Sequence, residues 1–133
     1  MPSRHVCIVI ATTIAVLPLL GVQRFDARKQ SHYDADAVTI HSARVDDRGR
    51  VRIEYHTRPE SLYFCPGADG EVQADRVEIR FVRAWYKKRP KVTYPAQKTS
   101  EENSMRRYVS IDADSKPIYM VSGEKRIRLY PKE

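Results

Sequence analysis

The stretch from residue 76 to residue 85, RVEIRFVRAW, decides the fold. Apolar side chains recur at every second position as far as Phe81, and charged side chains such as Glu78 and Arg80 stand between them. Because successive side chains of a β-strand point to opposite faces, this pattern predicts a strand with one buried face and one exposed face. The side chains assigned to the buried face are Val77, Ile79, Phe81 and Trp85.

Two other stretches alternate in the same way, residues 50–57 (RVRIEYHT) and residues 125–130 (KRIRLY). Strands with a single buried face are typical of antiparallel sheets, whereas the strands of parallel sheets are apolar on both faces. The three stretches therefore predict antiparallel pairing around one core. We expect this core to contain Val51, Ile53, Val77, Ile79, Phe81, Trp85, Val109, Ile111, Ile127 and Leu129.

The composition of residues 37–133 also favours strands. Val and Ile together number 15 in this range, while Leu occurs only at positions 62 and 129, and β-branched residues prefer strands to helices. Turn signals at 46–49 (DDRG), 66–70 (PGADG) and 122–124 (SGE) divide the range into about seven or eight short strands. Residues 95–104 read as a polar loop, and 99–107 has room for a turn or two of helix.

This spacing predicts an all-β fold over residues 37–133, an antiparallel β-sandwich of immunoglobulin-like architecture. The paired cysteines and the central tryptophan of a true immunoglobulin domain are absent from the sequence. The term therefore describes the expected architecture alone.

The N-terminal part of the chain has a different character. Residues 6–22 (VCIVIATTIAVLPLLGV) carry no charged side chain, and Arg4 precedes them. Seventeen uncharged residues are close to the shortest helix that spans a hydrocarbon layer of about 30 Å. We predict an N-terminal hydrophobic helix within residues 1–22, either a signal peptide or an uncleaved membrane anchor, followed by a polar linker over 23–36. Residues 37–133 would then lie outside the cytoplasm, membrane-anchored or secreted.

Catalytic motifs are not found in the sequence: it contains no glycine-rich phosphate loop, no GxSxG, no HExxH and no CxxC. No catalytic residue, metal ligand or cofactor is therefore predicted. A small exported hydrolase stays open as an alternative, with the loop carboxylates of Asp112 and Asp114 and the thiol of Cys65 as its candidates. We expect Cys65 to be buried, and we interpret His41 and His56 as surface side chains that one hairpin register would bring together.

Residues 80–98 (RFVRAWYKKRPKVTYPAQK) contain seven Lys and Arg and no Asp or Glu, with aromatic residues interleaved. Cations beside aromatic rings attract anions, so this segment is the predicted binding surface for an anionic polymer or a lipid head group. A solvated hairpin tip with Trp85 in the core is the competing interpretation. The candidate binding residues are Arg83, Trp85, Tyr86, Lys87, Lys88, Arg89 and Lys91.

The net charge of the domain and its predicted export both argue against a nucleic acid partner. Residues 33–133 carry 20 Lys and Arg against 16 Asp and Glu, a net charge of +4, which is modest for a nucleic-acid-binding domain. Export would also remove nucleic acid from reach, so no nucleic acid partner is expected. The sequence favours a membrane-tethered or secreted β-sandwich domain with a binding or structural role, which contacts the membrane through residues 6–22.

Overall fold

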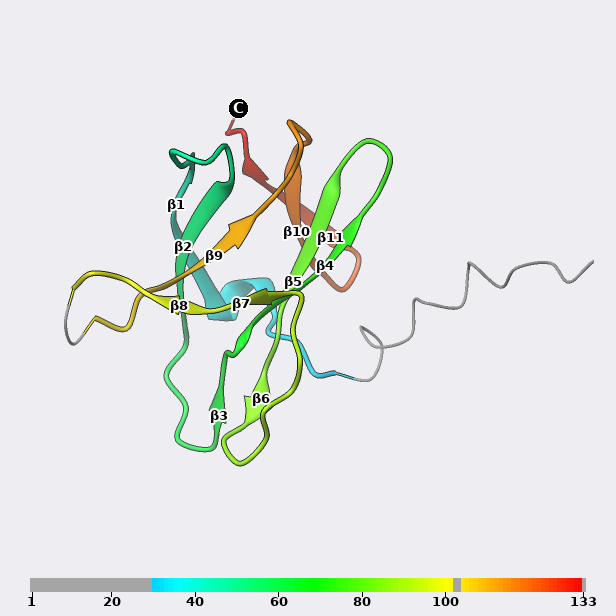
Figure 1. Ribbon diagram of the computed structural model, residues 1–133. Coiled ribbons are helices and arrows are strands. Elements are labelled where there is room, and N and C mark those ends of the chain that lie inside the picture. The colour runs from blue at the N-terminus through cyan, green and yellow to red at the C-terminus, as the bar shows by residue number, and fades with distance from the viewer. Residues whose placement is uncertain (1–29, 102–103, 133) are drawn as a thin grey trace, which may run out of the picture.

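A computed structural model describes residues 30–101 and 104–132. In these ranges the protein is all-β, with eleven strands and one short 3-10 helix, η1 (Ala35–Ala37) (Figure 1). The strands are β1 (Val38–Val45), β2 (Val51–Thr57), β3 (Tyr63–Phe64), β4 (Gly67–Val72), β5 (Val77–Phe81), β6 (Ala84–Trp85), β7 (Tyr94–Pro95), β8 (Gln97–Lys98), β9 (Arg107–Ile111), β10 (Ile118–Ser122) and β11 (Lys125–Tyr130). The strands outnumber the predicted seven or eight, because β3, β6, β7 and β8 are each only two residues long.

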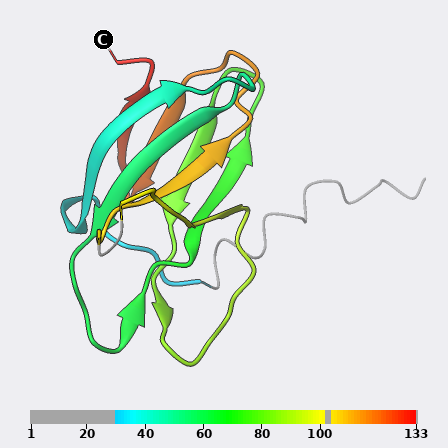
Figure 2. The same ribbon diagram turned by 60° about the vertical axis from the view of Figure 1, so that its left-hand side comes forward.

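Two sheets contain most of the strands. The first has the order β1-β2-β9-β8 and the second the order β11-β10-β5-β4-β7. The two sheets face each other, and the short ribbon formed by β3 and β6 extends beyond one end of them (Figure 2). Pairing among these strands is antiparallel except between β5 and β10, where Val77 lies opposite Ile118 in parallel register. The predicted all-β class is confirmed, with this one parallel pair as an addition.

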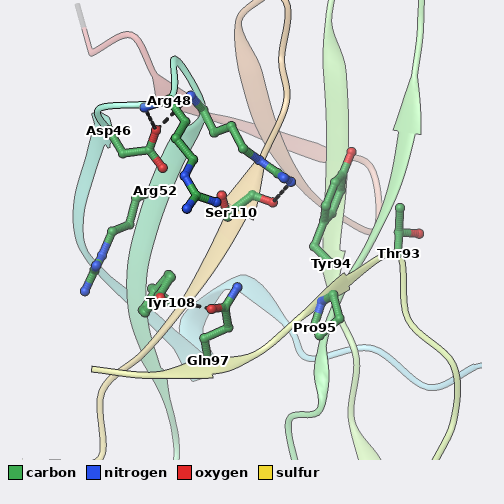
Figure 3. Close-up of a pocket in the computed structure, with 10 residues that line it drawn as sticks. Asp46, Arg48, Arg52, Thr93, Tyr94, Pro95, Gln97, Tyr108 and Ser110 are labelled. Atoms are coloured by element: carbon green, nitrogen blue, oxygen red, sulfur yellow. Dashed lines mark hydrogen bonds between the residues drawn. The ribbon is translucent and has the colours of Figure 1, made fainter. Parts of the chain in front are cut away.

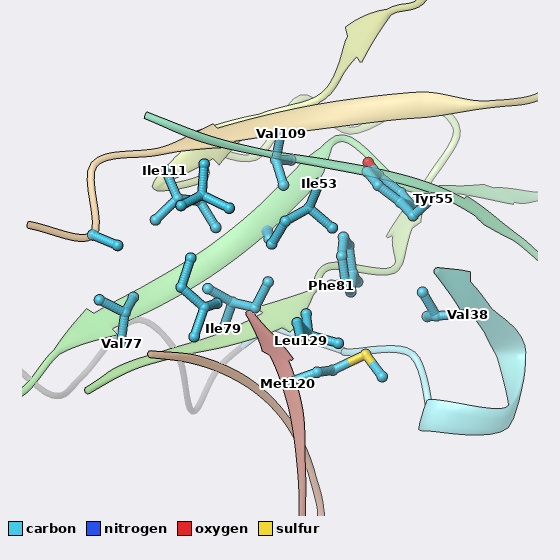
Figure 4. Close-up of a cluster of buried hydrophobic side chains, with 14 of the residues drawn as sticks. Val38, Ile53, Tyr55, Val77, Ile79, Phe81, Val109, Ile111, Met120 and Leu129 are labelled. Carbon is cyan, nitrogen blue, oxygen red and sulfur yellow. The ribbon is translucent and has the colours of Figure 1, made fainter. Parts of the chain in front are cut away.

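The core lies between the two sheets (Figure 4). Eight of the ten predicted core residues are at most 3% exposed, so the predicted alternation is confirmed in four strands, β2, β5, β9 and β11 at its Leu129 end. Tyr55 completes the buried face of β2, and its ring centroid lies 4.3 Å from that of Phe81. The eight residues are Val51, Ile53, Val77, Ile79, Phe81, Val109, Ile111 and Leu129.

Two core predictions are wrong. Trp85 is 41% exposed and Ile127 is 39% exposed. The strand predicted over 76–85 ends at Phe81, and Trp85 belongs to β6, which pairs with β3 outside the two sheets. Ile127 lies on the edge strand β11, where burial is confined to the end near Leu129.

Strand β4 occupies the range that sequence reasoning assigned to a turn. Residues 67–72 pair with β5 on one side and with β7 on the other. Glycines permit the approach of β7, since Gly67 has a φ of 149° and a Cβ at Gly67 or Gly70 would collide with atoms of Tyr94. The predicted polar loop at 95–104 contains β8 and the end of β7. No helical turn occurs in the described part of 99–107, where β9 begins at Arg107.

The described part of the predicted linker belongs to the fold. Tyr33 is buried, and its backbone N–H donates to the carbonyl of Phe81 at 2.9 Å. The N–H of Arg83 donates in turn to the carbonyl of Ser31 at 2.8 Å. The backbone from Ser31 onward therefore belongs to the fold, and the ring of Tyr33 packs in the core beside β5. Residues 1–29, with the predicted hydrophobic helix, lie outside the described residues. No described helix is both long and apolar enough for a membrane span.

A chain starting at Gln30 is expected to fold without residues 1–29. The packed residues supply their own core, and the described strands carry their own turns at 46–49 and 122–124. Far-ultraviolet circular dichroism should show a β-rich spectrum with a cooperative thermal transition. An unfolded or helix-dominated spectrum would show that the described fold requires the N-terminal residues.

Candidate functional site

The predicted binding residues lie on the ribbon formed by β3 and β6 and on the loop that follows β6. Tyr63 pairs with Trp85, and Phe64 pairs with Ala84. Beyond this pairing the backbone N–H of Tyr86 donates to the carbonyl of Leu62 at 2.9 Å. We call residues 60–64 and 83–91 the ribbon tip; it projects away from both sheets in Figures 1 and 2.

Arg83 stabilises the base of the ribbon tip. Its Nη2 donates to Oε1 of Glu60 at 2.7 Å and its Nε donates to Oε2 at 3.0 Å, a two-pronged ion pair. The guanidinium also lies 3.6 Å from the centroid of the Tyr63 ring. Hydrogen bonds from Arg83 lower the pKa of the Glu60 carboxyl, and those to Glu60 raise the pKa of Arg83. Because its charge is paired with Glu60 and its guanidinium lies on the ring of Tyr63, we interpret Arg83 as a residue that positions the ribbon.

Exposed apolar side chains gather at the end of the ribbon tip. Leu62 is 54% exposed, Trp85 41% and Tyr86 45%. The two aromatic rings meet edge to face at 5.3 Å between centroids, and Nζ of Lys87 lies 5.5 Å from the centroid of Trp85 and 5.6 Å from that of Tyr86. Tryptophan and tyrosine beside lysine suit a surface that meets a boundary between water and an apolar phase. Leu62 was missed by sequence reasoning, because it comes from a separate segment that only the β3–β6 pairing brings close.

Three of the tip cations carry uncompensated charge. Lys87, Lys88 and Lys91 are exposed, and no ion pair between described residues includes them. Arg89 differs, since its Nη1 donates to the carbonyls of Tyr86 at 2.8 Å and of Lys88 at 3.0 Å. The guanidinium of Arg89 therefore holds the loop together as well as adding charge.

The chain enters the described fold beside the ribbon tip. Nε2 of Gln30 donates to the carbonyl of Lys91 at 3.1 Å. Gln30 and Ser31 also form one wall of a cavity of about 320 Å³, and Trp85 and Lys88 line it from the ribbon. Sequence reasoning could not place Gln30 here, because its hydrogen-bond partner Lys91 is 61 residues away along the chain.

The residues of the hydrolase alternative are not brought together. Asp112 and Asp114 are exposed, and neither lines the cavity that contains Cys65 or the cavity beside Gln30. Within residues 30–101 and 104–132, no cluster of three or more His, Cys, Asp or Glu side chains could hold a metal ion.

Cys65 was predicted to be buried, and in the structure its side chain is partly buried. Its thiol donates to the carbonyl of Gly67 at 3.3 Å and lies 3.5 Å from the hydroxyl of Tyr55. Burial raises the pKa of the thiol. A thiol with a raised pKa stays protonated at neutral pH, and a protonated thiol is a weak nucleophile.

His41 and His56 meet on the outer face of the first sheet. A bulge at position 41 shifts the β1–β2 register, and Nε2 of His41 lies 2.6 Å from Nδ1 of His56. Burial, followed by the charges of Arg106 and His56, lowers the pKa of His41. One hydrogen bond therefore joins the two rings, in the hairpin register that the sequence did not determine.

Comparisons with protein-family models, with curated proteins and with solved structures found no match to this chain.

Proposed function

We propose that the protein is a membrane-anchored domain outside the cytoplasm, an immunoglobulin-like β-sandwich whose ribbon tip binds the head groups of an anionic membrane. The observation that carries this proposal is the position of Gln30, whose side chain is hydrogen-bonded to the loop of the tip. The two facing sheets support the sandwich architecture. The uncharged run at 6–22 supports the anchor.

The length of the intervening chain limits how far the tip can lie from the membrane. Seven residues, 23–29, separate the predicted membrane segment from Gln30. Even a fully extended chain of this length spans only about 25 Å. Since Gln30 lies against the ribbon, the tip is the part of the described fold that such a tether holds nearest to the lipid.

The chemistry of the tip fits an anionic lipid surface. The exposed apolar side chains of Leu62, Trp85 and Tyr86 suit the interfacial layer, where aromatic rings gather. The uncompensated lysines around them attract acidic head groups, and each basic residue near such a surface contributes about 1 kcal/mol. The two attractions act on one small surface, which favours a lipid head group over a soluble anionic polymer.

The test uses Trp85, the sole tryptophan of the chain, as a fluorescent probe. We expect the full-length protein in vesicles of phosphatidylcholine and phosphatidylglycerol to show blue-shifted emission and weaker acrylamide quenching than in pure phosphatidylcholine. The difference should shrink as salt rises past about 0.1 M, where the screening length is about 10 Å. The triple variant K87Q/K88Q/K91Q should lose most of the blue shift of Trp85 that acidic vesicles produce. Its melting temperature should be nearly unchanged.

The matched control K98Q/K125Q/K132Q removes the same number of charges at exposed positions outside the tip, and it should behave as wild type. Arg89 is kept in both variants because of its bonds within the loop. Identical Trp85 emission in neutral and acidic vesicles would overturn the proposal. Equal losses in the two triple variants would also contradict it, since they would indicate a general charge effect.

A further inference from the structure

A second candidate site lies outside the ribbon tip and shares no residue with it. A cleft of about 510 Å³ opens between the β1–β2 turn, strand β9 and the β7–β8 segment (Figure 3). Its volume exceeds that of the cavity beside Gln30, which is about 320 Å³. Strands from both sheets contribute to its walls, so its shape is fixed by the fold.

Positive charge dominates the cleft. Arg48, Arg50 and Arg52 line it, against a single acid, Asp46. That acid is occupied, since its Oδ1 accepts the backbone N–H of Arg48 at 2.8 Å and that of Arg50 at 3.0 Å. Asp46 therefore shapes the turn through hydrogen bonds to the backbone.

The three guanidinium groups differ in how many of their N–H donors are already hydrogen-bonded. Nη2 of Arg50 donates to the carbonyl of Ser110 at 3.0 Å, which leaves its other N–H groups without acceptors among the described residues. Arg48 takes part in no ion pair with a described residue. Arg52 is paired with Glu54 at 3.1 Å, and its Nε is buried without a partner in the described ranges. Since a guanidinium carries five N–H donors, the cleft has donors in excess.

The opposite wall supplies uncharged hydrogen-bonding groups. Oε1 of Gln97 accepts the hydroxyl of Tyr108 at 2.9 Å, so the amide N–H groups of Gln97 remain to donate. Oγ1 of Thr93 accepts the N–H of Gly70 at 3.1 Å and keeps its own hydroxyl proton. Tyr94 stands across the cleft from Arg48 in Figure 3, and burial raises the pKa of its phenol, which therefore remains a donor.

We infer that this cleft binds an anionic saccharide. Arg48 and Arg50 would hold a carboxylate or sulfate group, a planar or multi-oxygen anion that guanidinium groups recognise through paired hydrogen bonds. Gln97, Thr93 and Tyr94 would hold the sugar hydroxyls. A bare inorganic anion would leave these uncharged groups unused, and a neutral sugar would leave the arginines without a partner. This inference does not depend on the ribbon tip or on its lipid.

The test measures binding by the full-length protein in nonionic detergent, using calorimetry. The probes are tetragalacturonate, a sulfated heparin tetrasaccharide, neutral maltotetraose and inorganic phosphate. At least one anionic tetrasaccharide should bind ten times or more tighter than maltotetraose and phosphate. The variant R48Q/R50Q should weaken that binding at least tenfold and retain the wild-type circular dichroism spectrum.

The control variant K125Q/K132Q removes two exposed charges outside the cleft, and its affinity should stay within twofold of wild type. Comparable binding of maltotetraose would show that the arginines do not select the ligand. Phosphate bound as tightly as the tetrasaccharides would reduce the cleft to a simple anion site. Either result overturns the inference, as does the absence of binding by both anionic tetrasaccharides.

Discussion

Replacing Phe81 with alanine is expected to lower the free energy of unfolding by about 3–5 kcal/mol. The side chain is 1% exposed and packs against Tyr55, so its removal leaves a cavity between the two sheets. Since the free energy of unfolding of small domains is about 5–15 kcal/mol, this loss is a large share of the stability. Urea denaturation of residues 30–133 at 25 °C measures it, and Phe81→Leu provides a milder variant that should cost less than the alanine change.

Ile127→Ala provides the matched control for Phe81. The alternation of the sequence places both residues on a buried face, but Ile127 is 39% exposed on the edge strand β11. Its replacement should cost only about 1–2 kcal/mol, since its side chain is partly in water and its removal leaves no enclosed cavity. A loss at Phe81 as small as the one at Ile127 would show that the position of the core is wrong.

Gly67→Ala is expected to destabilise the protein by roughly 2–5 kcal/mol, the sum of backbone strain and overpacking. Gly67 has a φ of 149°, and an added Cβ would collide with the carbonyl oxygen of Tyr94 and come within 2.9 Å of Cγ2 of Val92. The backbone of β7 would have to move away from β4. Thermal and urea denaturation measure the effect.

Gly123→Ala is the control that separates backbone strain from the steric collision expected at Gly67. Gly123 also has a positive φ, 59°, but a Cβ there would have no neighbour within 4 Å. This variant should cost only about 1–2 kcal/mol, the price of the left-handed backbone. Equal losses at the two glycines would mean that the approach of β7 to β4 contributes nothing.

The sequence predicted those features of the fold that depend on local alternation. The buried faces of β2, β5 and β9 follow from residues two apart, and the turn at 46–49 follows from its own Asp and Gly. Strand β4 was missed because its glycines resemble a turn. Only the nearness of Tyr94, more than twenty residues later, explains them.

The sequence predicted the binding residues of the ribbon tip at 83–91 but not their spatial neighbours. The cations and aromatics at 83–91 are visible in the sequence, but the capture of Arg83 by Glu60 and the addition of Leu62 depend on the β3–β6 pairing. In the sequence, Arg48 belongs to the predicted turn at 46–49, and Arg50 and Arg52 belong to the polar face of the predicted strand over 50–57. Their cleft exists because Tyr94 and Gln97 arrive from a distant segment.

The parallel pairing of β5 with β10 has a consequence for how the chain folds during synthesis. In the second sheet Val77 lies opposite Ile118, 41 residues later in the chain. In the first sheet Val51 lies opposite Ile111, 60 residues later. Folding rates fall as the sequence separation of contacts grows, and domains of this kind fold in milliseconds to seconds. Neither sheet can be completed before its last strand has been made. The nascent domain is therefore exposed to proteases and chaperones until Leu129 emerges.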